Sequence, residues 1–187
     1  QEFTSYGGVV TGTANTLSAP EASVIGGFLD SAEGENALVG GGFENRATDL
    51  ADVAIGGEAN IASGNWANAV FGGSYNEANG ITSAVTGGTG NRAHGHDASV
   101  SGGTGNRAIA GGSSISGGEN NRVGSLQAEK EAPESPITEA LGGFGNGERP
   151  GRRSWIGGGF ANVIEGEFAA IFGGRELTAG GKYEAKP

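Results

Sequence analysis

The sequence predicts an all-β fold in which about eleven coils of about 15 residues stack into one parallel β-solenoid. The first observation is one line repeated at a fixed interval: residues 84–94 read AVTGGTGNRAH, residues 99–109 read SVSGGTGNRAI and residues 114–124 read SISGGENNRVG. The second is the abundance of glycine, 40 of 187 residues, without the period of three that marks collagen. The third is an alternation with a period of two inside each copy, which indicates strand and not helix.

Each copy is marked by the first glycine of a Gly-Gly pair. Successive markers lie 14 to 16 residues apart, except for one interval of 25 residues. The markers are Gly26, Gly41, Gly56, Gly72, Gly87, Gly102, Gly117, Gly142, Gly158 and Gly173, with a weaker copy at Gly12. Because the copies run almost from end to end, the sequence predicts a single domain over residues 1–187. The long interval predicts an inserted surface loop at residues 126–140.

Three further positions keep step with the marker and define two short strands in each coil. A β-branched residue such as Val100 lies two positions before the marker, an Asn such as Asn106 four after it, and an Ala such as Ala108 six after it. These residues share one parity with the first glycine, so we expect all four to point into a thin core. We expect the stacked Asn side chains to form a structural ladder of hydrogen bonds. Its members are Asn45, Asn60, Asn76, Asn91, Asn106, Asn121, Asn146 and Asn162.

Composition and charge argue against several classes of function. A formal net charge of −10 argues against nucleic acid as a partner, because phosphate binding needs a basic surface. No run approaches the roughly 18 apolar residues that span a bilayer, so we expect no membrane insertion by this chain. His94, His96 and Asp97 form AHGHD, which we interpret as a solvated turn and not as a metal site. We therefore expect no cofactor, no metal and no enzymatic activity, with a carbohydrate-active enzyme as the least favoured alternative.

The SVSGG, AVTGG and NRAxG lines at this spacing resemble the head repeats of YadA-like trimeric autotransporter adhesins, whose usual form is S-V-A-I-G-x-x-A-x-A-x-G. The resemblance implies a left-handed parallel β-roll that assembles as a homotrimer, secreted or at a bacterial cell surface. This sequence departs from the family because the first glycine replaces the Ile and an Asn opens the second strand. We also find no coiled-coil stalk, neck or membrane anchor in it, so we expect an isolated head or a stand-alone secreted protein.

A stripe of outward apolar residues is predicted to mediate assembly. Its members lie one position before the marker or two positions after it: Ile25, Phe28, Phe43, Ile55, Phe71, Phe144, Phe160 and Phe172. Recurrence at fixed coil positions favours protein–protein contact over scattered surface aromatics. Trimerisation is the use that the resemblance implies.

A row of arginines five positions after the marker is the second candidate contact surface. Arg92, Arg107 and Arg122 lie on three consecutive coils, where their charges repel unless a neutral or anionic group lies between them. One interpretation is a groove for an acidic glycan or for a partner's carboxylates, and the other is pairing with acids of a neighbouring subunit. Arg149, Arg152 and Arg153 are expected one coil from the acidic loop, where the alternatives are ion pairs, with that loop or between subunits, and a recognition patch.

Residues 1–5 and 182–187 are predicted to lie outside the coils, which leaves both ends of the solenoid bare. Unlike bare ends favour head-to-tail stacking. The sequence therefore predicts an extracellular structural protein that assembles with itself into a trimer, with a head-to-tail filament as an extension. The alternative is an adhesin head that binds a host or matrix protein or an acidic glycan.

Overall fold

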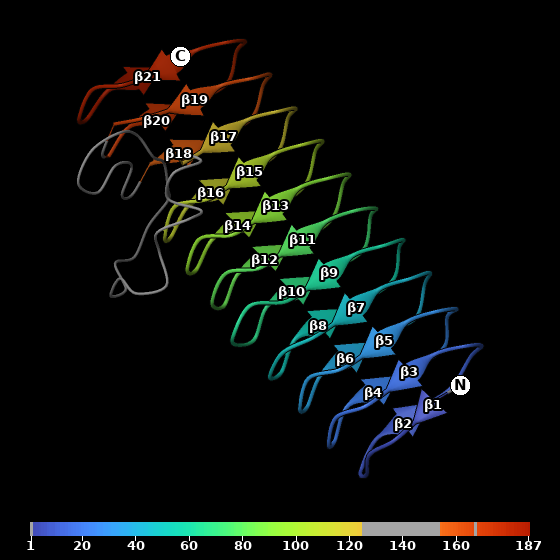
Figure 1. The fold of residues 1–187 in the computed structure, drawn as a ribbon. Helices are drawn as coiled ribbons and strands as arrows, with labels where there is room; N and C mark the ends of the chain where they lie inside the picture. Colours follow the sequence, from blue (N-terminus) through green and yellow to red (C-terminus); the bar gives the residue numbers. More distant parts are fainter. Residues whose placement is uncertain (1, 125–153, 167) are drawn as a thin grey trace.

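The computed structural model describes residues 2–124, 154–166 and 168–187, and it confirms the predicted parallel β-solenoid. Strands of two residues alternate between two parallel sheets, so each coil gives one strand to each sheet (Figure 1). The described residues contain no helix. The eleven strands of each sheet make about ten turns of chain, close to the predicted number. Handedness and the trimeric state stay predictions.

The odd-numbered sheet contains the strands that follow the Asn column. They are β1 (Glu2–Phe3), β3 (Thr16–Leu17), β5 (Ser31–Ala32), β7 (Arg46–Ala47), β9 (Ile61–Ala62), β11 (Glu77–Ala78), β13 (Arg92–Ala93), β15 (Arg107–Ala108), β17 (Arg122–Val123), β19 (Val163–Ile164) and β21 (Thr178–Ala179).

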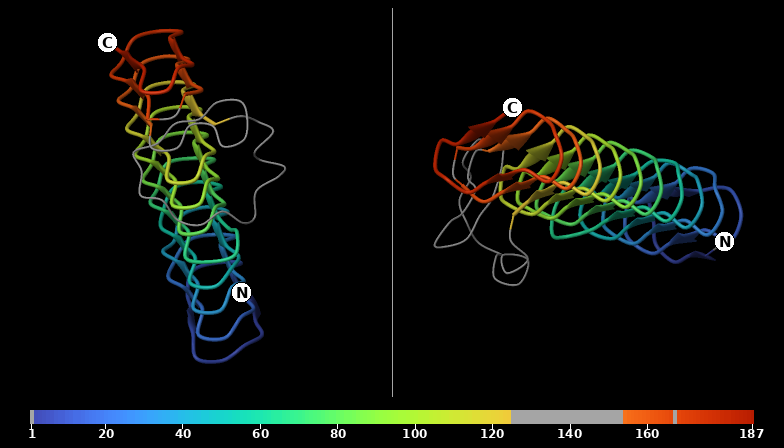
Figure 2. Two further views of the ribbon diagram at one scale, coloured as in Figure 1. Left: turned by 90° about the vertical axis from the view of Figure 1, so that its left-hand side faces the viewer. Right: turned by 90° about the horizontal axis from the view of Figure 1, so that it is seen from above.

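The even-numbered sheet contains the strands that precede the glycine pair. They are β2 (Val9–Val10), β4 (Ser23–Val24), β6 (Leu38–Val39), β8 (Val53–Ala54), β10 (Ala69–Val70), β12 (Ala84–Val85), β14 (Ser99–Val100), β16 (Ser114–Ile115), β18 (Trp155–Ile156), β20 (Ala170–Ile171) and β22 (Ala185–Lys186). Eleven strands at a spacing of about 4.8 Å give a rod roughly 50 Å long, and its elongated shape is evident in Figure 2.

Each sheet contributes a single layer of inward-pointing side chains to the core. In the strands from β3 to β21 the second residue points inward and is buried, while the first residue faces outward. Val100 of β14 and Ala108 of β15 are both fully buried, which shows how the even-numbered sheet supplies the larger residues and the odd-numbered sheet the smaller ones. Small inward residues let the two sheets approach closely.

The buried Asn column forms a continuous hydrogen-bonded ladder at the corner before the odd-numbered sheet. The backbone N–H of Asn106 donates to Asn91 Oδ1, and Asn106 Oδ1 accepts from the N–H of Asn121, both at 2.9 Å. Asn106 Nδ2 donates to the carbonyls of Gly102 and Gly118, each at 2.9 Å. Each side-chain amide therefore satisfies backbone groups of its own coil and of the next one. The same amide-to-glycine bonds recur at Asn45, Asn60, Asn76, Asn91, Asn121 and Asn162.

The prediction that the first glycine of each pair points into the core is wrong. A Cβ built on Gly102 would meet no atom within 4 Å, so this position faces open space. The second glycine is the one that the fold requires: Gly103 has a φ of +86°, and its Cβ would collide with the carbonyl oxygen of Gly118 in the next coil. The strand ends at Val100, and the alternation by two does not continue through the turn that follows.

The described coils on the two sides of the long marker interval pair directly with each other. Ile115 of β16 pairs directly with Ile156 of β18, and the N–H of Asn162 donates to Asn121 Oδ1 at 3.0 Å, so no coil lies between them. The intervening copy marked by Gly142 belongs to residues 125–153. Outside the described residues lie the predicted loop 126–140, Phe144, Asn146, Arg149, Arg152 and Arg153.

The prediction that both chain ends lie outside the coils is also wrong. Within residues 1–5, Glu2–Phe3 form β1, and within residues 182–187, Ala185–Lys186 form β22. Because a strand of this solenoid needs only two residues, the five or six residues at each chain end are enough to add one more strand to a sheet.

Candidate functional site: an uncharged sheet face

The outer surface of the even-numbered sheet carries no charged residue along its described length, although charged residues make up 17% of the chain. We define this uncharged face by the first residue of each even-numbered strand and the residue that follows the strand. Its members are Val9, Thr11, Ser23, Ile25, Leu38, Gly40, Val53, Ile55, Ala69, Phe71, Ala84, Thr86, Ser99, Ser101, Ser114, Ser116, Trp155, Gly157, Ala170, Phe172, Ala185 and Pro187. A face without charge on a protein of net charge −10 is a surface suited to contact with another macromolecule.

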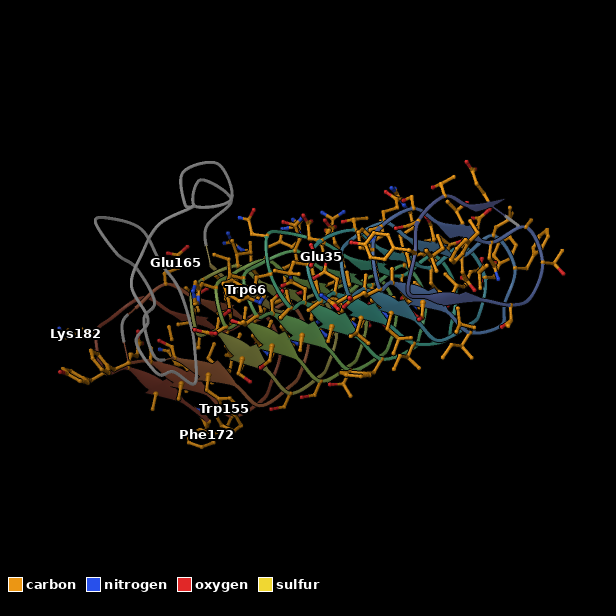
Figure 3. All side chains as sticks on the ribbon, turned by 90° about the horizontal axis from the view of Figure 1, so that it is seen from below. Glu35, Trp66, Trp155, Glu165, Phe172 and Lys182 are labelled. Atoms are coloured by element: carbon orange, nitrogen blue, oxygen red, sulfur yellow. The ribbon has the colours of Figure 1, made fainter. Side chains whose placement is uncertain are left out.

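Large apolar side chains on the uncharged face are well exposed from the N-terminal end to β10 and again at the C-terminal end. Ile25 is 58% exposed, Phe71 47% and Phe172 62%. Trp155 packs edge-on against Phe172 with ring centroids 5.4 Å apart, and Figure 3 shows the two rings together at one end of the rod. Small residues, mostly Ser and Thr, occupy the coils from β12 to β16, so the surface there is polar but uncharged.

The predicted assembly stripe divides between two sides of the solenoid. Ile25, Ile55, Phe71 and Phe172 lie on the uncharged face. The remaining described members lie on a third side, where single residues pair from coil to coil: Phe28, Phe43 and Phe160. On that side Phe28 and Phe43 stack with centroids 5.7 Å apart, but Glu58 follows them in the column and Arg175 lies over the Phe160 ring. The third side therefore mixes aromatic and charged groups.

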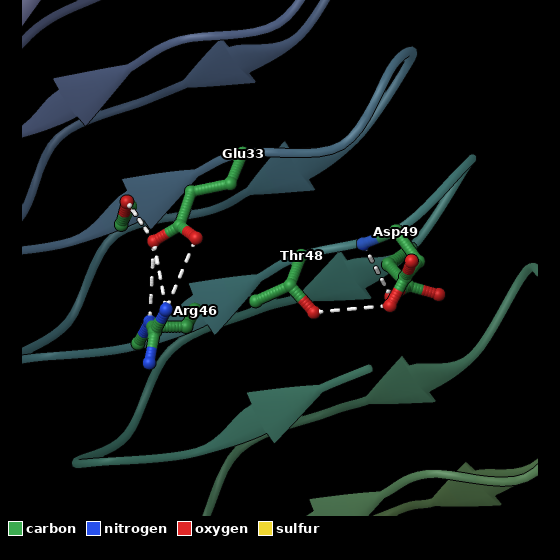
Figure 4. A network of polar contacts seen from close by, with 6 residues as sticks. Glu33, Arg46, Thr48 and Asp49 are labelled. Atoms are coloured by element: carbon green, nitrogen blue, oxygen red, sulfur yellow. Dashed lines mark hydrogen bonds and ion pairs between the residues drawn. The ribbon is translucent and has the colours of Figure 1, made fainter. Parts of the chain in front are cut away.

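The odd-numbered sheet presents a charged outer surface with local ion pairs. Arg46 of β7 forms a two-pronged ion pair with Glu33 of the preceding coil, with Nη2 2.9 and 3.0 Å from the two carboxylate oxygens (Figure 4). Both side chains are exposed, so the pair contributes little to stability.

The predicted arginine row lies on this sheet, with Arg92, Arg107 and Arg122 in direct register. The outer two arginines have carboxylate partners, since Arg92 lies 3.3 Å from Glu77 and Arg122 lies 3.9 Å from Glu165. Arg107 forms no ion pair with any residue that the structure describes. The row thus carries a local excess of positive charge at its centre.

The AHGHD turn provides polar contacts but no metal cluster. His94 Nε2 lies 3.3 Å from Glu77 Oε1, and His96 Nδ1 lies 2.7 Å from Asp97. The hydrogen bond with His94 lowers the pKa of the Glu77 carboxyl. In the described part of the chain no group of three or more His, Cys, Asp or Glu side chains could hold a metal ion.

A second buried polar column, four positions before the marker, was missed by the sequence reasoning. Asp52 Oδ1 accepts from the N–H of Asn68 at 2.8 Å, and the N–H of Ser83 donates to Asn68 Oδ1 at 3.0 Å. Burial raises the pKa of Asp52, and hydrogen bonds from Asn68 and from the N–H of Asp49 (Figure 4) oppose that rise. The column mixes Asp, Asn, Ser and Ala, so no single residue type repeats to reveal it in the sequence.

Asp30 interrupts the Asn ladder with a buried carboxyl. Its Oδ1 accepts from the N–H of Asn45 at 2.8 Å, but its Oδ2 has no hydrogen-bond partner and the residue is fully buried. Burial raises the pKa of this carboxyl, against two opposing hydrogen bonds from Asn45, and its neutral form can donate a hydrogen bond as the amide of an Asn does.

We expect Asp30→Asn to stabilise the protein by about 1–3 kcal/mol at pH 7, because an amide supplies the missing donors. A carboxyl whose pKa is raised by folding contributes its full stability below its unfolded-state pKa, near 3.9 for Asp, and loses it as the pH rises through the folded-state pKa. The advantage of the Asn variant should therefore shrink toward zero at pH 3. Urea unfolding of both proteins at pH 3 and pH 7 tests this, and an equal advantage at both values contradicts it.

No protein-family model matches the chain, and no curated protein matches it. No helix in the described residues is long and apolar enough to cross a membrane. Fold and surface together define the class: a glycine-rich parallel β-solenoid with one uncharged face and one charged face.

Proposed function

We propose that the chain is a non-catalytic structural protein, secreted or at a cell surface, that assembles laterally into a homotrimer through its uncharged face. The observation that carries the proposal is the absence of charged residues from the outer face of the described even-numbered sheet, in contrast with Glu33, Arg46, Arg92 and Glu165 on the odd-numbered sheet. Selective removal of charge from one side supports contact with a macromolecule at that side.

A second copy of the same chain is the occupant that fits best. The uncharged face is roughly 50 Å long, from eleven strands at about 4.8 Å, so two parallel rods can meet along their whole length. Its apolar ends, with Ile25 and Phe172, supply anchor residues, and the Ser-rich middle allows close approach. The number three rests on the resemblance of the repeats to YadA-like head repeats.

The test is the mass of the purified protein, measured by light scattering at micromolar concentration for the wild type, Ile55→Lys and Ile61→Lys. We expect three chains for the wild type and for Ile61→Lys, whose substitution lies on the odd-numbered sheet of the same coil. Ile55→Lys places a charge on the uncharged face, and we expect at least about a 100-fold weaker assembly. Lysine lowers the net negative charge, so general repulsion cannot explain such dissociation.

A monomeric wild type would refute the proposal. If the wild type has a mass of two chains and Ile55→Lys is monomeric, the uncharged face is the interface but the assembly is a dimer and not a trimer. Equal effects of Ile55→Lys and Ile61→Lys would show that the uncharged face has no special role.

An adhesin head that binds an acidic glycan or a matrix protein is the second candidate. The excess positive charge at Arg107, between Arg92 and Arg122, favours it. A sulfated glycan that binds the wild type in a salt-sensitive way, and binds Arg107→Gln markedly less, would support this candidate.

A further inference from the structure

The last coil of the solenoid breaks the repeat at three buried columns at once. Leu177 takes the place of the ladder Asn: its N–H donates to Asn162 Oδ1 at 3.0 Å, as the N–H of an Asn does in the other coils, but its side chain has no amide to continue the ladder. Lys186 is in register with Ile171, in the column that elsewhere holds apolar residues. Glu184 follows Ala169 in the second polar column. The carbonyl of Glu184 accepts from the N–H of Ala170, and in the preceding coil the carbonyl of Ala169 accepts in the same way from the N–H of Trp155.

The two charged residues of this coil form a pair across the open end of the core. Lys186 Nζ lies 2.5 Å from Glu184 Oε1, and Glu184 Oε2 accepts from the N–H of Gly181 at 2.8 Å. Beneath them Ile171 is fully buried, and Leu177 packs against the same core cluster. Figure 2 shows the C-terminal coil as the outermost turn of this end.

The opposite end of the solenoid has no such charges at its inward positions. Phe3 is in register with Leu17, and Val10 with Val24. Phe3 remains 47% exposed, and Val10 packs against the core. The two ends therefore differ in chemistry: one is apolar, and the other is covered by an ion pair.

We propose that residues 177–187 form a charged cap that closes this end of the solenoid to a second copy of the chain. An incoming copy would extend both sheets by placing its β1 on β21 and its β2 on β22. Such a contact would bury Glu184 and Lys186 beneath apolar residues, and desolvation of the two charges opposes it. Inward-pointing charge is also a recognised protection of exposed strand edges. The cap limits axial growth, and it does not depend on the lateral trimer proposed above.

The test restores the repeat at the cap. Glu184→Ser/Lys186→Ile brings back the residue types of the columns, and Ser keeps the bond to the turn, as Ser83 Oγ does when it accepts from Gly80 N–H at 2.9 Å. We expect end-to-end association, seen by electron microscopy as rods at least twice the wild-type length and by sedimentation as a mass at least doubled. The wild type should show single-length rods under the same conditions.

A matched control removes a different ion pair from the same coil. Arg175→Ile/Glu176→Ala deletes an exposed pair that lies 3.3 Å apart and points outward. Ala161 occupies the equivalent left-handed position of the preceding coil, with a φ of +52° against +54° at Glu176, so Ala is tolerated there. We expect this control to keep the wild-type rod length.

Two results would overturn the proposal: a cap variant that is folded by circular dichroism but keeps the wild-type rod length, or a wild type that itself forms end-to-end rods. Lys186→Ile alone is the second variant, because it leaves the Glu184 bond to Gly181 intact if the double variant fails to fold. Rod length reports on axial contacts and mass at constant length on lateral ones, so failure of the cap and failure of the trimer are distinguishable.

Discussion

Replacing Val100 by Asp should unfold the coils around β14. Val100 is fully buried between Val85 and Ile115, and the buried residues of the described chain include no Lys or Arg that could pair with a carboxylate. Burial without a partner shifts the pKa of a carboxyl by about 3–5 units, at about 1.4 kcal/mol per unit, which gives a penalty of roughly 4–7 kcal/mol at pH 7. That penalty is comparable with the whole stability of a typical domain, about 5–15 kcal/mol.

The effect should spread beyond one coil. Each coil of a solenoid contacts only its neighbours, so loss of one coil removes the support of the next. The measurement is the β signal in circular dichroism during thermal unfolding. The matched control is Ile61→Asp, an outward substitution of the same kind on β9, which should change the midpoint only slightly. A Val100→Asp protein with wild-type thermal stability would contradict the assigned inward direction of this column.

The fold could be predicted because the same physical requirement recurs in every coil. Residues of the same type as Val100 and Ala108 recur at a fixed spacing, because each coil needs a side chain of similar size at the same place in the core. The direction of the glycines could not be derived in this way, because parity fails where the chain turns at Gly102 and Gly103. The long marker interval showed that the repeat was disturbed, but not that pairing passes directly from β16 to β18.

The uncharged face could be predicted only in part. Ile25 and Phe71 were identified because large apolar residues recur at the position just before the marker glycine. The face also depends on Ser99 and Ser101, which reveal nothing until their common side is known. The cap was missed for the opposite reason: Glu184 and Lys186 look like an ordinary charged end until the register with Ile171 places them over the core.

Removing one amide from the ladder should be the second most damaging substitution. Asn106→Ala leaves the N–H of Asn121 without its acceptor and the carbonyl of Gly102 without its donor, whereas the carbonyl of Gly118 keeps the N–H of Thr104. Each buried backbone group left without a partner costs about 1–3 kcal/mol, so we expect a loss of roughly 3 kcal/mol or more in the free energy of unfolding. Urea unfolding at pH 7 measures it, with Ser101→Ala on the outer surface of the same coil as the control.

Asn106→Asp separates the loss of hydrogen bonds from the loss of packing. The carboxyl has nearly the size of the amide and keeps the acceptor for Asn121, but its ionised form has no donor for Gly102 and Gly118. It reproduces the chemistry of Asp30, whose pKa is raised by burial. Stability lost at pH 7 should therefore return as the pH falls and the carboxyl becomes a donor, whereas the Asn106→Ala loss should persist at low pH. If the Asp and Ala variants respond alike to pH, the amide column stabilises the coils by filling space and not by its hydrogen bonds.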